Sequence, residues 1–185
     1  EHLLASAAEL APERQVVVAG HGREQLEVAL GGRAAIAVQE PQLGTGHAVQ
    51  QAESALEGFS GDVLVLYGDV PFVSADTMRA MIGRLHAPDA PAVVVLAFEP
   101  ADPLQYGRVI TEGDRVVKMV EHKDASEAER AVRLCNSGLM AARAADLFDL
   151  LGKVGNDNAA GEYYLVDVVN IAHAEGRPCA VVVTP

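Results

Sequence analysis

The feature that most constrains the fold is a set of short apolar runs, rich in Val, Leu and Ile, that recur through the first hundred residues. Residues 15–19, 34–38, 62–66 and 92–98 form these runs, and they do not alternate apolar with polar side chains. Segments of helical pattern lie between them. Because strands without alternation are buried on both faces, this order of elements predicts an α/β fold, with a mostly parallel sheet covered by helices on both faces.

The pattern changes near residue 105. Residues 107–111 and 115–121, joined by Glu-Gly-Asp, are typical of a β-hairpin. Beyond the hairpin we expect a short helix at 126–132, a strand at 136–141, helices at 144–151 and 163–175, and a last strand at 179–183. No internal repeat or low-complexity linker interrupts the chain. The 185 residues therefore predict one domain, whose halves 1–105 and 106–185 share a sheet.

Composition narrows the classes of function. The net charge of −12 opposes a general nucleic-acid surface, because phosphate backbones attract clustered Lys and Arg. Small phosphorylated ligands stay compatible, since backbone N–H groups can bind them locally. No run of eighteen apolar residues occurs, so no membrane span is expected. The two cysteines, Cys135 and Cys179, lie in apolar contexts, which favours a reduced, cytoplasmic protein.

The loop at 39–47, Gln-Glu-Pro-Gln-Leu-Gly-Thr-Gly-His, opens a helix predicted to end near residue 56. Glycines at 44 and 46 let the backbone pass close to a ligand, and a helix N-terminus favours polar or anionic groups. No P-loop lysine follows, and the third glycine of a dinucleotide fingerprint is absent. The amides of Gln39 and Gln42 suit the edge of a base. An ordinary strand-to-helix turn explains the loop equally well.

The run at 62–66 ends in Tyr67-Gly68-Asp69. Ligands of open α/β sheets bind beyond the carboxyl ends of strands, and Mg²⁺ takes one or two carboxylates plus substrate phosphates. Asp69 is therefore a candidate Mg²⁺ ligand, although a turn-capping aspartate has the same pattern. The run Glu121-His-Lys-Asp124 lacks a second His or Cys at ligand spacing, so a solvated charge run is the simpler interpretation. We predict no side-chain nucleophile.

The order of these motifs carries more information than any one of them. Gln-x-x-Gln-Leu-Gly-Thr-Gly-His-Ala, Tyr-Gly-Asp-Val-Pro, Tyr-Gly-Arg, Val-Glu-His-Lys-Asp-Ala, Asn-Ser-Gly and Gly-Glu-Tyr-Tyr occur in succession. Over essentially its whole length the chain resembles the pyrophosphorylase domain of the bacterial bifunctional N-acetylglucosamine-1-phosphate uridyltransferase/glucosamine-1-phosphate acetyltransferases, the GlmU family. The resemblance implies a Rossmann-like nucleotidyltransferase fold and, from UTP and N-acetylglucosamine 1-phosphate, the products UDP-N-acetylglucosamine and pyrophosphate.

The resemblance also implies site residues. The nucleotide side, in 1–105, comprises Gln39, Gln42, Gly44, Thr45, Tyr67 and Gly68. Asp69 is expected to bind Mg²⁺. The sugar side, in 106–185, comprises Gly107, Glu121, Asn136 and Tyr164. Position 166 is Val where the family has a Thr that contacts the sugar phosphate.

Three family elements are missing from this sequence: the triphosphate loop that would precede Glu1, a second metal-binding segment that would follow Pro185, and the β-helix acetyltransferase domain. We therefore expect a truncated domain, inactive alone, from a homotrimeric parent. Two other interpretations stay open. One is another sugar-1-phosphate nucleotidyltransferase, such as a glucose-1-phosphate thymidylyltransferase; the other is a non-catalytic binding or assembly module of the same fold.

Overall fold

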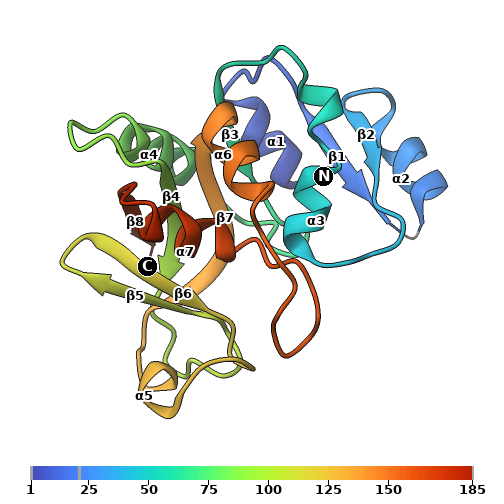
Figure 1. The fold of residues 1–185 in the computed structure, drawn as a ribbon. Coiled ribbons are helices and arrows are strands. Elements are labelled where there is room, and N and C mark those ends of the chain that lie inside the picture. Colours follow the sequence, from blue (N-terminus) through green and yellow to red (C-terminus); the bar gives the residue numbers. More distant parts are fainter. Residues whose placement is uncertain (1, 21, 185) are drawn as a thin grey trace.

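The computed structural model describes residues 2–20 and 22–184, which form two sheets of unequal size with helices around them (Figure 1). The larger sheet has the strand order β3-β7-β4-β8-β6-β5, and the smaller pairs β1 with β2. The strands are β1 (Val16–Ala19), β2 (Ala35–Val38), β3 (Asp62–Val65), β4 (Val93–Phe98), β5 (Arg108–Glu112), β6 (Arg115–Val120), β7 (Cys135–Arg143) and β8 (Cys179–Thr184). The helices are α1 (His2–Ala8), α2 (Arg23–Leu30), α3 (Thr45–Gln50), α4 (Ala75–Leu85), α5 (Glu127–Arg130), α6 (Ala144–Leu151) and α7 (Asp167–Ala174), with a 3₁₀ turn η1 (Ser54–Leu56).

The predicted α/β class is confirmed, but the mostly parallel sheet is not. Only β1 with β2 and β4 with β8 pair in parallel among the described residues. Strand β7 lies between β3 and β4 and is antiparallel to both, and the hairpin β5–β6 joins the other edge through the antiparallel pair β6–β8. An apolar run indicates that a strand is buried on both faces, but it does not indicate the direction of that strand. The central strand β7 has several buried residues although it is antiparallel to its neighbours, so the sequence pattern could not reveal its direction.

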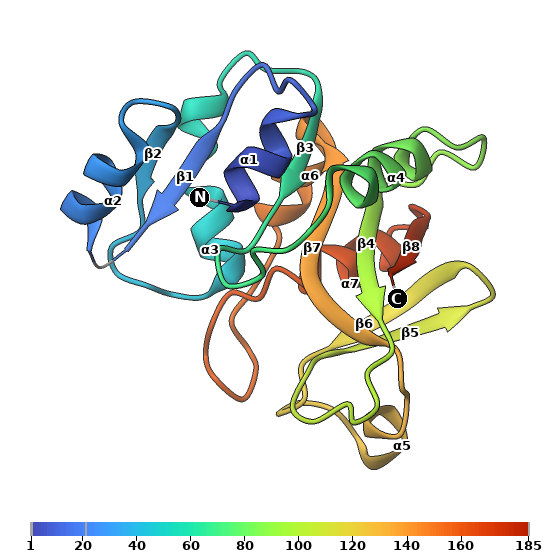
Figure 2. The same ribbon diagram turned by 180° about the vertical axis from the view of Figure 1, so that it is seen from behind.

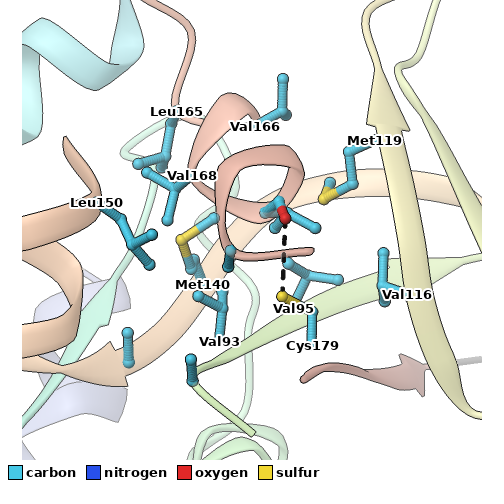
Figure 3. Packing of buried hydrophobic residues seen from close by; sticks show 14 of the residues in the cluster. Val93, Val95, Val116, Met119, Met140, Leu150, Leu165, Val166, Val168 and Cys179 are labelled. Atoms are coloured by element: carbon cyan, nitrogen blue, oxygen red, sulfur yellow. Dashed lines mark hydrogen bonds between the residues drawn. The ribbon is translucent and has the colours of Figure 1, made fainter. Parts of the chain in front are cut away.

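Helices cover both faces of the larger sheet, as predicted (Figures 1 and 2). Successive residues of β4 point to opposite faces: Val93 and Val95 join the cluster under α6 and α7, while Val94 and Leu96 join the cluster under α4. Figure 3 shows part of the first cluster, with Val168 of α7 above Met140 of β7 and Val93 of β4. All these side chains leave water almost completely, so β4 contributes apolar burial on both sides of the sheet.

The helix boundaries follow local signals where the sequence supplies them. The Ser74 hydroxyl accepts a hydrogen bond from the Thr77 backbone N–H at 3.1 Å and caps the start of α4. Two expectations need correction. The helix predicted from 44 to 56 ends at Gln50 and is followed by η1, and the helix predicted from 163 begins only at Asp167.

The two cysteines are buried and not bonded to each other, as expected for a reduced protein. Burial raises the pKa of the Cys179 thiol to about 12 and also raises that of Cys135, so both are held as neutral thiols. Their role in this fold is to fill the core.

Candidate functional site

A cavity of about 1360 Å³ lies between the smaller sheet, α3 and strand β3. Apolar side chains of β1 and β3 form much of its wall. Polar groups gather where β3 ends and where the loop before α3 begins. Among the site residues predicted from sequence, those that line the cavity are Gln39, Gln42, Thr45, Tyr67, Gly68 and Asp69. The structure thus brings the nucleotide-side candidates to one place.

Buried hydrogen bonds hold the loop 39–47 in shape. Gln39 is only 8% exposed, and its backbone N–H donates to the Ala19 carbonyl at 2.9 Å. Its side-chain Nε2 donates to the Gly44 carbonyl at 2.9 Å and lies 3.0 Å from Nδ1 of His47. The side chain of Gln42 lies against Gly20, where a Cβ atom would come within 1.8 Å of the Gln42 amide nitrogen. The loop therefore presents its amides on a fixed backbone.

The glycines of this loop are explained first by a crossing of two chain segments. Gly44 has φ 117°, and a Cβ atom there would lie 2.6 Å from the Tyr163 carbonyl oxygen. The Gly46 N–H donates to that same oxygen at 2.8 Å, and the Tyr163 N–H donates to the Leu43 carbonyl at 2.8 Å. These bonds hold residues 162–166 outside α7, which is why the helix begins late. Close approach of this backbone to a ligand stays a prediction.

Tyr67, just beyond β3, connects the two halves of the site. Burial raises the pKa of its hydroxyl to about 12; a hydrogen bond with Thr45 opposes this shift, and the carboxylates of Glu121 and Asp69 add to it. Its ring covers Gly138, where a Cβ atom would lie 2.7 Å from the ring carbons. Thr45 contributes in a second way, because its hydroxyl accepts a hydrogen bond from the Leu165 backbone N–H at 2.9 Å.

The sugar-side candidates meet where β5, β6 and β7 come together. A Cβ atom on Gly107 would lie 3.3 Å from Glu121 Oε2, and the Asn136 N–H donates to the Gly107 carbonyl at 2.9 Å. The Asn136 Oδ1 accepts a hydrogen bond from the Gly138 N–H at 2.9 Å. Gly138 adopts φ 88° where the β4–β7 register shifts, so it is a bulge within β7 and not the simple turn that its sequence suggests.

Further acidic groups surround Glu121. Burial, together with the negative charges of Asp124 and Asp167, raises the pKa of Glu121, while Lys123 opposes the shift. Burial also raises the pKa of Tyr164, with Asp124 and Glu121 as the next causes. The charge of Glu121 therefore acts on Tyr164, and a shared role in sugar binding stays a prediction.

Asp124 also connects two loops. Its backbone N–H donates to the Glu121 carbonyl at 3.0 Å, and its Oδ1 accepts from the Ala159 N–H at 2.8 Å. Sequence reasoning missed Asp124 and Asp167, because a charge run and the first turn of a helix are both ordinary surface patterns. The one sequence signal that could have indicated Asp124 as a site residue was its position three residues after Glu121.

Arg108 is a second structural residue that the sequence did not reveal. It is 2% exposed, and its guanidinium donates to four backbone carbonyls and to no carboxylate in the described part of the chain. These carbonyls belong to Pro103, Leu104, Tyr106 and Arg130. Arg108 thereby fixes the loop that leads into Gly107, because the guanidinium presents several donors in a fixed plane.

Asp69 is the best-placed carboxylate for a metal ion. It is exposed beside the cavity and makes no hydrogen bond or ion pair within residues 2–20 and 22–184. No group of three or more His, Cys, Asp or Glu side chains in the same residues is arranged to hold a metal alone. Mg²⁺ is commonly bound by one or two protein carboxylates together with the phosphates of a ligand. A single carboxylate beside a cavity is compatible with that kind of site. In the described residues no helix is long and apolar enough to cross a membrane.

Comparisons with known proteins identify the family of the chain. A family model described as the MobA-like NTP transferase domain matches residues 1–135. The chain is 78% identical over 183 residues to the bifunctional protein GlmU of Novosphingobium aromaticivorans, covering 99% of this chain and 41% of the relative. It is 76% identical, with the same coverage, to the protein of that name from Sphingopyxis alaskensis. The chain thus spans about two fifths of the length of the curated relatives it matches.

A solved structure of UDP-glucose pyrophosphorylase complexed with UDP-glucose has the same fold, with a TM-score of 0.69 and 19% identity. The similarity covers 97% of this chain and 76% of that one. The resemblance to the GlmU family inferred from the motifs is confirmed by the curated relatives. The chain belongs to the family of MobA-like NTP transferase domains.

Proposed function

We propose that this chain is the uridylyltransferase part of an enzyme that forms UDP-N-acetylglucosamine and pyrophosphate from UTP and N-acetylglucosamine 1-phosphate. The observation that carries the proposal is the position of Tyr67. Tyr67 lines the cavity together with Thr45 and Asp69, and its ring lies against Gly138 of β7 beside the sugar-side group. A nucleotide and a sugar phosphate bound on either side of this residue would have their phosphates in contact.

In the proposed reaction a phosphate oxygen of the sugar phosphate attacks the α-phosphorus of UTP. A new P–O bond forms there, the bond to the bridging oxygen of the β-phosphate breaks, and pyrophosphate leaves. No covalent enzyme intermediate is needed, so the chain contributes mainly position and charge. Gln39, Gln42 and the backbone at Gly44 and Thr45 would face the uracil, with Tyr67 and Gly68 beside the nucleotide. Gly107, Glu121, Asn136 and Tyr164 would hold the N-acetylglucosamine.

Asp69 is the residue that we propose to hold Mg²⁺ together with the substrate phosphates. When bound, the ion would neutralise negative charge on those phosphates. Asp69 suits this role because it lies beside the cavity and no side chain in the described part of the molecule satisfies its carboxylate. Normal turnover after replacement of Asp69 would show that this residue is an ordinary turn residue and not a metal ligand.

The direct test is an assay of pyrophosphate release by the full-length protein with Mg²⁺, UTP and N-acetylglucosamine 1-phosphate. We expect this pair to give a higher kcat/KM than dTTP with glucose 1-phosphate. Preference for the second pair would assign the chain to the thymidylyltransferase alternative. Binding of both substrates without turnover would favour the non-catalytic module.

Several finer statements belong to the same proposal. The nucleotide-side and sugar-side halves, the homotrimeric parent and the inactivity of residues 1–185 alone stay predictions. A cytoplasmic location is supported by two buried, unpaired thiols, since disulfides are rare in that compartment.

A further inference from the structure

The side-chain amide of Gln39 can place its oxygen and nitrogen in two ways, and the neighbouring groups permit only one of them. Its side chain is one of two polar side chains that are buried in the described residues. The atom 2.9 Å from the Gly44 carbonyl must be the nitrogen, since a carbonyl oxygen only accepts hydrogen bonds. The second hydrogen of that nitrogen points to Nδ1 of His47, 3.0 Å away. Both hydrogens of the amide are therefore used inside the protein.

His47 must then carry its proton on the other ring nitrogen. Nδ1 can accept from Gln39 only when it is unprotonated, so the ring is neutral with its hydrogen on Nε2. Gln51 competes for the same ring: its Nε2 lies 3.2 Å from His47 Nε2 and donates to the His47 carbonyl at 3.0 Å. A neutral imidazole accepts only one hydrogen bond. The Gln51 nitrogen already has an acceptor in the His47 carbonyl, and the Gln39 contact with the ring is shorter and more buried, so we assign the accepting nitrogen to Nδ1.

The remaining atom of the amide, Gln39 Oε1, is the atom left to accept a hydrogen bond from a ligand. It accepts no hydrogen bond in the described structure, yet no fully buried side-chain oxygen or nitrogen there lacks a partner. Oε1 therefore has access to solvent, and Gln39 lines the cavity. His47 is not among the residues that line the cavity, so it lies behind Gln39 as seen from the ligand.

We propose that His47 is a positioning residue for base selection: by accepting a hydrogen bond from the Gln39 amide nitrogen, it holds Gln39 Oε1 toward the nucleotide as an acceptor. This inference rests on the proposed function and deepens it. An acceptor at that position matches a base with a ring N–H, such as uracil. It opposes cytosine, whose corresponding ring nitrogen is itself an acceptor. A rotated amide would present a donor and reverse the preference.

The test compares kcat/KM for UTP and for CTP in the full-length protein. His47→Ala removes the acceptor behind Gln39 but leaves the Gly44 carbonyl, so the amide keeps only part of its orientational preference. We expect the UTP-to-CTP ratio to fall by about five- to tenfold, the equivalent of one net hydrogen bond. His47→Asn places an amide oxygen at the position of Nδ1, and it should restore most of the ratio.

Gln51→Ala is the matched control, because it removes the amide on the opposite side of the same ring. It should leave the UTP-to-CTP ratio unchanged. A control that lowers the ratio as much as His47→Ala would overturn the proposal, as would an unchanged ratio in a folded His47→Ala protein. If the wild-type protein does not use UTP at all, the proposed function fails, which is a separate outcome.

A spectroscopic measurement tests the same inference without activity and without any variant that has to fold. Nitrogen-15 NMR of labelled histidine distinguishes the two neutral tautomers and the cation. We expect the His47 ring to be neutral and protonated at Nε2. A ring protonated at Nδ1 would place its N–H against the N–H of the Gln39 amide. That result would contradict the proposed orientation of Gln39.

Discussion

The nucleotide side and the sugar side of the proposed site are built from different chemical groups. The nucleotide side is built from amides, a hydroxyl and backbone groups, fixed by the crossing of the loop 39–47 with residues 162–166. The sugar side is built around the partly buried carboxylates Glu121 and Asp167, both of which have raised pKa values. If the two sides bind as we propose, geometry would select the nucleotide, while charge and desolvation would govern the sugar. Substitutions should therefore separate the two sides by their kinetic effects.

The largest effect is expected at Asp69, where the two sides meet. Asp69→Asn removes the one carboxylate that we assign to the metal and should lower kcat by about 10²- to 10³-fold, the usual cost of losing an electrostatic contact to developing charge. Pyrophosphate release at saturating substrates and varied Mg²⁺ measures this effect. Asp114→Asn is a suitable control because Asp114 is an exposed residue in the β5–β6 hairpin turn. Equal activity of the two variants would remove Asp69 from the site.

The next effect separates the sugar side from the nucleotide side. Glu121→Ala leaves sugar hydroxyl groups without a charged acceptor, a loss of about 1.5–3 kcal/mol for a hydrogen bond to a charged group. The KM for N-acetylglucosamine 1-phosphate should rise by roughly ten- to a hundredfold on that scale. The KM for UTP should change little. A selective rise in the KM for UTP would mean that the two sides have been assigned in reverse.

A third prediction concerns the stability of the nucleotide loop. Gly44→Ala places a Cβ atom 2.6 Å from the Tyr163 carbonyl at a backbone conformation that only glycine adopts readily. We expect a loss of about 1–3 kcal/mol in the free energy of unfolding, measured by urea denaturation.

The matched variant for this prediction is Gly68→Ala, which meets no atom within 4 Å and should leave the stability unchanged. Equal stability of the two variants would show that the loop can separate from residues 162–166. The crossing would then not fix the nucleotide side, contrary to the description above.

Sequence predicted much of this architecture because the relevant signals are local. The β5–β6 hairpin and helix α6 follow from patterns of a few neighbouring residues. Ordered motifs predicted two groups of residues, and the structure brings together most members of each group, while their roles stay predictions.

What sequence did not predict depends on contacts between distant segments. The direction of β7 is set by its insertion between β3 and β4, which no pattern within β7 encodes. The extended segment before α7 depends on hydrogen bonds to Leu43 and Gly46, more than a hundred residues earlier. The second role of Asp124, as acceptor for the Ala159 N–H, is hidden for the same reason.

The smallest expected effect is a pH shift that should be confined to the sugar side. Burial and the charge of Asp124 raise the pKa of Glu121, so this carboxylate ionises at a higher pH than an exposed one. Asp124→Asn removes the charge but keeps an oxygen that can accept from the Ala159 N–H, so the loop contact should survive. The pKa of Glu121 should then fall toward its ordinary value. If ionised Glu121 binds the sugar, the acid limb of kcat/KM for N-acetylglucosamine 1-phosphate should move to lower pH.

The stability of the protein should follow the same sign. Because the folded pKa of Glu121 is raised, its contribution to stability is present below the unfolded pKa and is lost as pH rises through the folded value. Asp124→Asn should reduce that loss, which urea unfolding at several pH values measures. Lys123→Gln is the opposite control, because the Lys123 charge lowers the pKa of Glu121 and its removal should move the acid limb to higher pH. Shifts in one direction for both variants, or equal shifts in the UTP profile, would show that Glu121 does not control the pH response of the sugar side.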